Sequence, residues 1–144
     1  MTQRSCPCGQ RPAADDSDIR VLVVDDHALV RSTLTDLLSD EPDVTVVGEC
    51  EDGSQVVDAV ERLRPDVVLM DLSMPVMNGL AATEALRAVR PEPRVVVLTA
   101  EPDVRPEVEA AGADALIPKG VRSGALLGCV RTVVVGCGCC PYCL

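Results

Sequence analysis

The sequence predicts a doubly wound α/β fold, in which five helices cover the two faces of a five-stranded parallel sheet. Two observations lead to this fold class. Short apolar runs recur along the chain, and each is followed by a stretch with the spacing of an amphipathic helix. The apolar runs do not alternate with polar residues, which is typical of strands buried on both faces of a parallel sheet.

The expected strands are runs rich in valine and leucine at residues 20–24, 44–47, 67–70, 95–98 and 115–117. Three expected helices carry apolar stripes, formed by Val30, Leu34, Leu37 and Leu38, by Val56, Val60 and Leu63, and by Leu126, Val130, Val133 and Val134. Weaker helical patterns cover 82–89 and 107–111. No repeat or long linker interrupts the alternation, so this part of the chain is expected to form one domain.

The composition predicts a core of aliphatic side chains and argues against two classes of ligand. The 144 residues are 47% hydrophobic but include one Tyr and no Phe or Trp. The net charge of −10, from 13 basic and 23 acidic residues, disfavours a broad basic face for nucleic acid or an anionic membrane. The sequence shows no signal peptide, membrane-length apolar run or prenylation pattern, so the expected localisation is cytoplasmic.

Polar side chains stand at the carboxyl ends of the first, third, fourth and fifth expected strands: Asp25 and Asp26, Asp71, Thr99, and Lys119. Open parallel sheets bind ligands at this edge. Clustered carboxylates repel one another unless a cation neutralises them, and oxygen ligands favour a hard ion such as Mg²⁺. The pattern therefore predicts a magnesium site, although acids at strand ends can also simply cap helices.

The chain has one lysine and one histidine, and each lies just beyond the carboxyl end of an expected strand. Lys119 stands against twelve arginines elsewhere, and its compact ammonium can approach an anion as a point charge. We therefore expect Lys119 to face the acidic residues. His27 follows two acids but is expected to begin the first helix rather than to act as a base or a metal ligand.

Four segments in this order resemble the receiver domain of bacterial two-component response regulators: VLVVDDH, PDVVLMDLSMPVMNGL, VVVLTA and GADALIPKG. The segments DDHALVR and VTVVGECEDG are most similar to receivers joined to LuxR-type (NarL-type) DNA-binding domains. The resemblance covers residues 19–136 and implies the flavodoxin-like receiver fold.

The resemblance implies that Asp71 accepts a phosphoryl group from the phosphohistidine of a sensor histidine kinase. Asp26, Asp71 and the backbone carbonyl of Ser73 would bind Mg²⁺ directly, and Asp25 would hold it through water. Such a chain is not an enzyme in the usual sense. It is a phosphoacceptor that takes part in its own Mg-dependent phosphorylation and dephosphorylation.

The resemblance also implies a switch. Lys119 and Thr99 would bind the phosphoryl oxygens, consistent with the charge neutralisation that phosphoryl transfer requires. The modified state would hold Thr99 turned inward. Family members usually carry an aromatic residue three positions before the lysine, where this chain has Leu116, and often a proline where it has Gly120. The first departure bears on coupling to the face formed by the fourth helix, fifth strand and fifth helix.

Two further positions follow from the resemblance. Ser73 and Glu101 lie two residues after Asp71 and Thr99, respectively. In receivers these positions flank the attacking water and tune the lifetime of the phosphoryl group. The alternative is that both are solvated loop residues.

Three segments are expected: a disordered polar leader at 1–18, a receiver domain at 19–136 and a Cys-rich tail at 137–144. Similar receivers are normally followed by a helix-turn-helix domain, and no recognition helix or basic patch follows here. We therefore expect no DNA binding by this chain alone. Its expected partners are a sensor kinase and either a second copy or an output protein, and the sequence leaves open a stand-alone receiver or a truncated regulator.

Six of the eight cysteines lie in the terminal segments: Cys6, Cys8, Cys137, Cys139, Cys140 and Cys143. This distribution is unlike a disulfide framework, which usually runs through a whole small fold. The expected topology places both termini opposite the acidic edge, where the thiolates could bind zinc or sense redox state. The alternative is reduced cysteines without a ligand. Cys50 and Cys129 are expected to pack in the core.

Two other functional classes were weighed against the phosphoacceptor. Haloacid-dehalogenase-like phosphatases also combine an aspartate nucleophile with Mg²⁺, but they place it after the first strand in a D-x-D arrangement, which DDHAL does not match. A pseudo-receiver that only binds partners would lack an acidic, hydroxyl or lysine position, and none is missing here.

Overall fold

The computed structural model describes residues 18–72, 74, 77–101, 103–135, 142 and 144. Within these ranges the chain forms one sheet of five strands, in the order β2-β1-β3-β4-β5. The strands are β1 (Ile19–Val24), β2 (Val44–Cys50), β3 (Val67–Asp71), β4 (Arg94–Thr99) and β5 (Ala115–Pro118). Every neighbouring pair is parallel. The predicted doubly wound fold is therefore confirmed.

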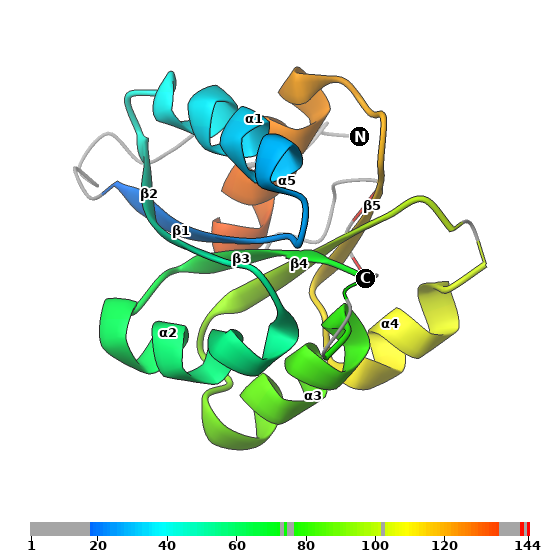
Figure 1. Ribbon diagram of the computed structural model, residues 1–144. Coiled ribbons are helices and arrows are strands. Elements are labelled where there is room, and N and C mark those ends of the chain that lie inside the picture. Colours follow the sequence, from blue (N-terminus) through cyan, green and yellow to red (C-terminus); the bar gives the residue numbers. More distant parts are fainter. Residues whose placement is uncertain (1–17, 73, 75–76, 102, 136–141, 143) are drawn as a thin grey trace, which may run out of the picture.

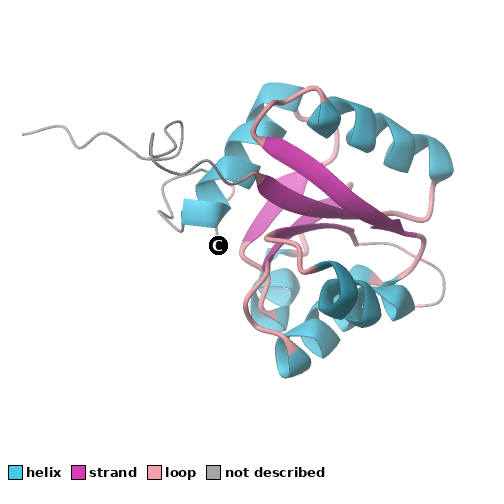
Figure 2. Cartoon of the chain, turned by 90° about the vertical axis from the view of Figure 1, so that its left-hand side faces the viewer, coloured by secondary structure: helices cyan, strands magenta, loops and turns pink. Residues whose placement is uncertain are grey.

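Helices cover both faces of this sheet (Figure 1). Helices α1 (Ala28–Ser39) and α5 (Ser123–Val135) lie on one face. Helices α2 (Val56–Leu63), α3 (Gly79–Val89) and α4 (Arg105–Ala111) lie on the other, and the short 3-10 helix η2 (Gly53–Gln55) leads into α2. Figure 2, turned by 90°, shows the sheet between the two helical layers.

The core is aliphatic, as the composition predicts, and the sheet divides it into two clusters. One cluster lies under α1 and α5 and includes Val23, Leu69 and Ile117. The other lies under α2, α3 and α4 and includes Met70 and Val97. The central strands β1 and β3 are almost wholly buried, because both of their faces are covered by helices.

The edge strands differ from the expectation of burial on both faces. β2 is buried only near its two ends, and the residues between them are partly or fully exposed. β5 is likewise only half buried. An edge strand has a neighbour on one side only, so less of its surface is covered.

Helix α1 also covers the sheet less closely than its apolar stripe predicts. Val30 is exposed, and Leu34 and Leu37 are half-buried.

The two cysteines in the body of the fold, Cys50 and Cys129, are buried, as predicted, and neither is in a disulfide. Burial raises the pKa of the Cys50 thiol to about 11, although the charge of Arg62 opposes this shift. At neutral pH Cys50 is therefore a protonated, apolar packing residue. None of the helices in the described part of the chain is long and apolar enough to span a membrane.

Replacing Leu69 in the centre of β3 tests the core. Leu69 is fully buried, so Leu69→Ala is expected to lower the free energy of unfolding by about 2–5 kcal/mol, measured by urea denaturation. Leu29→Ala is the matched control, because Leu29 on α1 is 79% exposed and its loss should change stability by less than about 0.5 kcal/mol. Equal effects of the two substitutions would contradict this assignment of the core.

Candidate functional site

The carboxyl ends of four strands bring the predicted site residues to one edge of the sheet. Asp25 directly follows β1, Asp71 ends β3, Thr99 ends β4 and Lys119 follows β5. Because β3 lies between β1 and β4, Asp71 stands in the middle of this row. The topology alone thus collects an acid, a hydroxyl and an amine from distant parts of the sequence.

The acidic residues form a compact cluster at this edge. Asp25, Asp26, His27 and Asp71 each offer a ligand atom, and these atoms all lie within 4.8 Å of one another. Asp25 is fully buried and Asp71 is 2% exposed, whereas Asp26 is partly exposed. Buried carboxylates at this separation repel strongly, because little water screens them. We call these four residues the acidic cluster.

Asp25 is fixed by its own backbone and its neighbours. Its amide donates to the carbonyl of Cys50 at 3.1 Å, and its side-chain Oδ1 accepts from the amide of His27 at 2.9 Å. Arg31 donates to the backbone carbonyl of Asp25 at 2.7 Å and also pairs with Glu49 at 3.1 Å. These contacts hold the carboxylate in place from the α1 and β2 side.

One carboxylate oxygen of Asp25 is buried, and the described part of the chain offers it no hydrogen bond. Its Oδ2 has no hydrogen-bond partner among the described residues. A buried, uncompensated carboxylate oxygen is costly, and a cation is the simplest group that would satisfy it. The oxygen-rich donor set of the acidic cluster fits a hard divalent ion such as Mg²⁺. The residues present therefore fit the predicted metal.

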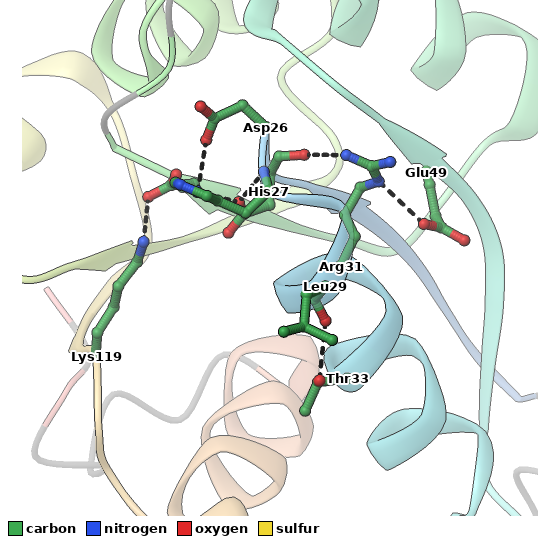
Figure 3. A network of polar contacts seen from close by, with 9 residues as sticks. Asp26, His27, Leu29, Arg31, Thr33, Glu49 and Lys119 are labelled. Carbon is green, nitrogen blue, oxygen red and sulfur yellow. Dashed lines mark hydrogen bonds and ion pairs between the residues drawn. The ribbon is translucent and has the colours of Figure 1, made fainter.

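Lys119 approaches the acidic cluster from the β5 side. Its Nζ lies 2.9 Å from Oδ1 of Asp71. Figure 3 shows the Lys119 side chain extending toward the cluster, with Arg31 and Glu49 on the far side of Asp26 and His27. Burial lowers the pKa of Lys119, but the hydrogen bond to Asp71 and the charges of the three acids outweigh it and raise the pKa above its ordinary value. The ammonium is therefore fully charged at neutral pH.

Thr99 is buried beside this ion pair. Its backbone carbonyl accepts from the amide of Lys119 at 2.7 Å, which joins β4 to the residue that follows β5. Its hydroxyl accepts from the amide of Glu101 at 2.9 Å, so the side chain is held against the loop after β4. Turning the hydroxyl toward Asp71 would exchange this hydrogen bond for another.

The start of helix α3 is packed tightly against the backbone of Asp71. Asn78 is the N-cap of α3, and its side chain accepts from the amide of Ala81 at 2.9 Å. Gly79 comes next, and a Cβ at this position would lie 2.5 Å from the backbone carbonyl of Asp71. Only glycine allows this approach, so the Asn78-Gly79 pair fixes the start of α3 under the acid.

His27 occupies the N-cap position of α1, as predicted from its place in the sequence. Its Nδ1 nevertheless lies 3.1 Å from Oδ1 of Asp26 and 3.5 Å from Oδ1 of Asp25. The side chain is 68% exposed, so it lies at the outer rim of the acidic cluster. Sequence reasoning did not place His27 in the cluster, although its position directly after two acids was a usable signal.

Helix α5 ends opposite the acidic edge, as expected, because Arg131 near its end pairs with Glu41 and Asp43, which precede β2. Beyond the helix, the described residues Tyr142 and Leu144 lie along the edge of β5, which the sequence did not predict. The amide of Leu116 donates to the carbonyl of Tyr142 at 2.9 Å, so the chain returns to β5 after α5. Tyr142, Leu116, Thr99 and Lys119 line one hollow of about 400 Å³. Sequence reasoning missed Tyr142, because topology predicts where a helix ends but not where the chain beyond it goes.

Several predicted residues cannot be placed. Ser73 and the six terminal cysteines (Cys6, Cys8, Cys137, Cys139, Cys140 and Cys143) lie outside the described residues. Glu101 is described, and it lies exposed in the loop after β4.

A second hollow of about 610 Å³ opens beside the acidic cluster. Its lining includes Asp26, His27, Asn78 and Glu101.

Residues 21–131 match the protein family described as the response regulator receiver domain. This chain belongs to that family. The matched range includes the acids at the strand ends and Lys119.

Two curated relatives match most of this chain. Response regulator GacA of Pseudomonas viridiflava is 41% identical over 120 residues, which cover 82% of this chain and 56% of the relative. Transcriptional regulatory protein LiaR of Bacillus subtilis is 39% identical over 121 residues, covering 82% and 57%. The chain thus spans little more than half the length of these relatives.

Solved receiver structures confirm the fold. The response regulator domain of Thermotoga maritima CheB has a TM-score of 0.76 at 32% identity, covering 82% of this chain and 97% of that one. The receiver domain of NarL from Mycobacterium tuberculosis has a TM-score of 0.79 at 31% identity, covering 83% and 98%. Because both CheB-type and LuxR-type proteins resemble this receiver, the matches show the family and leave the subfamily to be proposed.

Adding a methyl group at Gly79 tests the packing beneath Asp71. Gly79→Ala is expected to lower the free energy of unfolding by about 1–3 kcal/mol, because the new Cβ would overlap the Asp71 carbonyl. Gly124→Ala in α5 is the control, since nothing lies within 4 Å of a Cβ there, and it should be neutral or stabilising by up to about 1 kcal/mol. Denaturation curves in urea measure both, and a neutral Gly79→Ala would contradict the tight approach.

Proposed function

We propose that this receiver accepts a phosphoryl group on Asp71 from a histidine kinase and changes conformation in response. One observation carries the proposal. A nearly buried carboxylate, Asp71, pairs with the only lysine of the chain and lies within the acidic cluster. An ion pair alone would not require two further acids beside it, whereas phosphoryl transfer requires positive charge around a carboxylate nucleophile.

The transfer forms one bond to phosphorus and breaks another. An oxygen of Asp71 attacks the phosphorus of the donor phosphohistidine, so a P–O bond forms while the P–N bond to the imidazole breaks. The imidazole nitrogen keeps the electron pair of the broken bond and is protonated as it leaves. Hydrolysis of the resulting acyl phosphate by water returns Asp71 to its carboxylate and releases inorganic phosphate.

Asp25, Asp26 and Asp71 would hold Mg²⁺, together with the carbonyl of Ser73, which is assigned by resemblance. When bound, the ion neutralises negative charge on the transferring phosphoryl group. The buried, unsatisfied oxygen of Asp25 supports this assignment. Fixed contacts from Cys50, His27 and Arg31 hold Asp25 in place before any ligand arrives.

Lys119 and Thr99 would receive the phosphoryl group on Asp71. Lys119 supplies a full positive charge 2.9 Å from Oδ1 of Asp71, and it can transfer its contact from the carboxylate to a phosphoryl oxygen. Thr99 would turn its hydroxyl from the Glu101 amide toward the phosphoryl group. This exchange moves the loop after β4, and we propose it as the switching step. Ser73 and Glu101 would tune the lifetime of the phosphoryl group.

We also propose a LuxR-type (NarL-type) subfamily, a receiver at 19–136 and a terminal segment at 137–144. The relative LiaR, a transcriptional regulatory protein that is nearly twice as long as the region matched here, supports a role in transcription regulation. A sensor kinase and a second copy or output protein would be the partners. The expected lack of DNA binding by these 144 residues stays a prediction. A zinc or redox role for the terminal cysteines is the alternative function, and its six residues lie outside the described part.

Incubation with acetyl phosphate and Mg²⁺ tests the phosphoacceptor. Mass spectrometry should show one added phosphoryl group on Asp71, and Asp71→Asn should abolish it. Asp58→Asn is the control. This acid on α2 is 81% exposed and is not part of the acidic cluster, so the variant should be labelled like the wild type. Labelling that survives Asp71→Asn would sink the assignment, and sustained turnover of phosphate esters would favour a phosphatase instead.

Removing one acid tests the cation site through stability rather than activity. Mg²⁺ should raise the thermal midpoint of the wild type, because it relieves repulsion in the folded state. Asp26→Asn should weaken Mg²⁺ binding by about tenfold or more, because removing even a residue that only hydrogen-bonds to a metal ligand lowers metal affinity by about tenfold. In metal-free buffer the same variant should be at least as stable as the wild type, because one like charge is gone. A Mg²⁺-independent midpoint in the wild type would refute the site.

A further inference from the structure

The β5 edge is occupied by the C-terminal end of this chain. The amide of Leu116 donates to the carbonyl of Tyr142, and the amide of Leu144 donates to the carbonyl of Asp114, both at 2.9 Å. Along β5 the partners run from Asp114 to Leu116, while on the other segment they run from Leu144 back to Tyr142. The pairing is therefore antiparallel, in contrast to the all-parallel sheet that it extends. In Figure 1 the red end of the chain lies beside β5.

Side-chain packing accompanies these hydrogen bonds. Tyr142 is half-buried and packs against the cluster under α1 and α5. Leu144 is also half-buried and packs against the cluster under α2, α3 and α4. The two residues thus bury apolar surface with both layers of the fold, which stabilises the docked position beyond the backbone pairing alone.

The docked segment lies next to the phosphoacceptor machinery. Tyr142 lines the hollow of about 400 Å³ that Thr99, Leu116 and Lys119 also line. The backbone of β5 connects the two ends of this hollow directly, because Leu116 binds the terminal segment and Lys119, three residues later, binds Asp71. A change at either end therefore acts on the same short strand.

We propose that the two docked residues, Tyr142 and Leu144, act as an edge strand: they close β5 to other strands, and they dock preferentially on the unmodified receiver. An open strand edge would offer unpaired amides and carbonyls to a second chain, and the docked residues occupy them. The edge strand therefore blocks strand addition by an extended partner at this edge. Docking itself is independent of the function proposed above, whereas its preference for the unmodified state rests on that function.

The preference follows from the geometry of the hollow. Docking is seen with Lys119 paired to an unmodified Asp71 and with the Thr99 hydroxyl held by Glu101. A phosphoryl group on Asp71 would draw both Lys119 and Thr99, which form walls of the hollow that Tyr142 lines. The edge strand then loses the surface to which it is fitted. By linkage, anything that weakens docking should favour the modified state to the same degree.

The docking is tested with a proline substitution at the end of the chain. Leu144→Pro removes the amide that binds Asp114, and Leu144→Ala is the matched control that keeps it. Hydrogen exchange of the Leu116 amide, followed by NMR, should be slow in the wild type and in Leu144→Ala. In Leu144→Pro it should be faster by about fivefold, the amount that corresponds to one lost hydrogen bond. Amides of the central strands β1 and β3 should be unchanged in all three proteins.

The coupling is tested by repeating the exchange measurement after treatment with acetyl phosphate and Mg²⁺. Exchange at Leu116 should accelerate by about fivefold or more in the wild type and not in Asp71→Asn. Fast exchange at Leu116 in the untreated wild type would overturn docking. A mass gain at Asp71 with unchanged exchange would overturn the coupling alone. If Asp71 is never labelled, the phosphoacceptor assignment and the coupling both fail, and docking is still judged by the first comparison.

Discussion

The structure is organised around the repulsion between carboxylates that the sheet forces together. Asp25 and Asp71 follow adjacent central strands, and both side chains are almost completely buried. In a sheet with β3 beside β1, the ends of these strands cannot be far apart. Three features of the site offset this negative charge. Lys119 pairs with Asp71, the backbone amide of His27 donates to Asp25, and the buried oxygens without a partner among the described residues suit a divalent ion. The carboxylates at this edge of the sheet therefore destabilise one another, and the proposed Mg²⁺ would reduce their repulsion.

Much of this could be predicted from the sequence for a simple physical reason. Parallel strands with helices on both faces read as continuous apolar runs, and the polar residue that ends each run lies at the ligand-binding edge. The positions of Asp25, Asp71, Thr99 and Lys119 follow from that rule. The observed strand boundaries differ from the predicted ones by one to three residues, and β3, for example, extends one residue further to include Asp71.

Features that depend on tertiary contact were not predictable in the same way. The exposure of Val30 depends on how closely α1 approaches the sheet, which its stripe does not encode. The return of Tyr142 to β5 depends on pairing between residues far apart in the chain. The close approach of Gly79 to the backbone of Asp71, directly after the N-cap Asn78, is likewise a tertiary contact that the sequence pattern does not encode.

The valine-rich strands have a consequence for how the receiver can move. A β-branched side chain is restricted about its first torsion angle even in the unfolded chain, so ordering it costs little side-chain entropy. The centre of the sheet, with Val21, Val23, Val67, Val68, Val95, Val96 and Val97 all fully buried, is therefore a stiff platform. Binding or phosphorylation at the acidic edge should therefore move the loops and the edge strand β5, while the centre of the sheet keeps its shape.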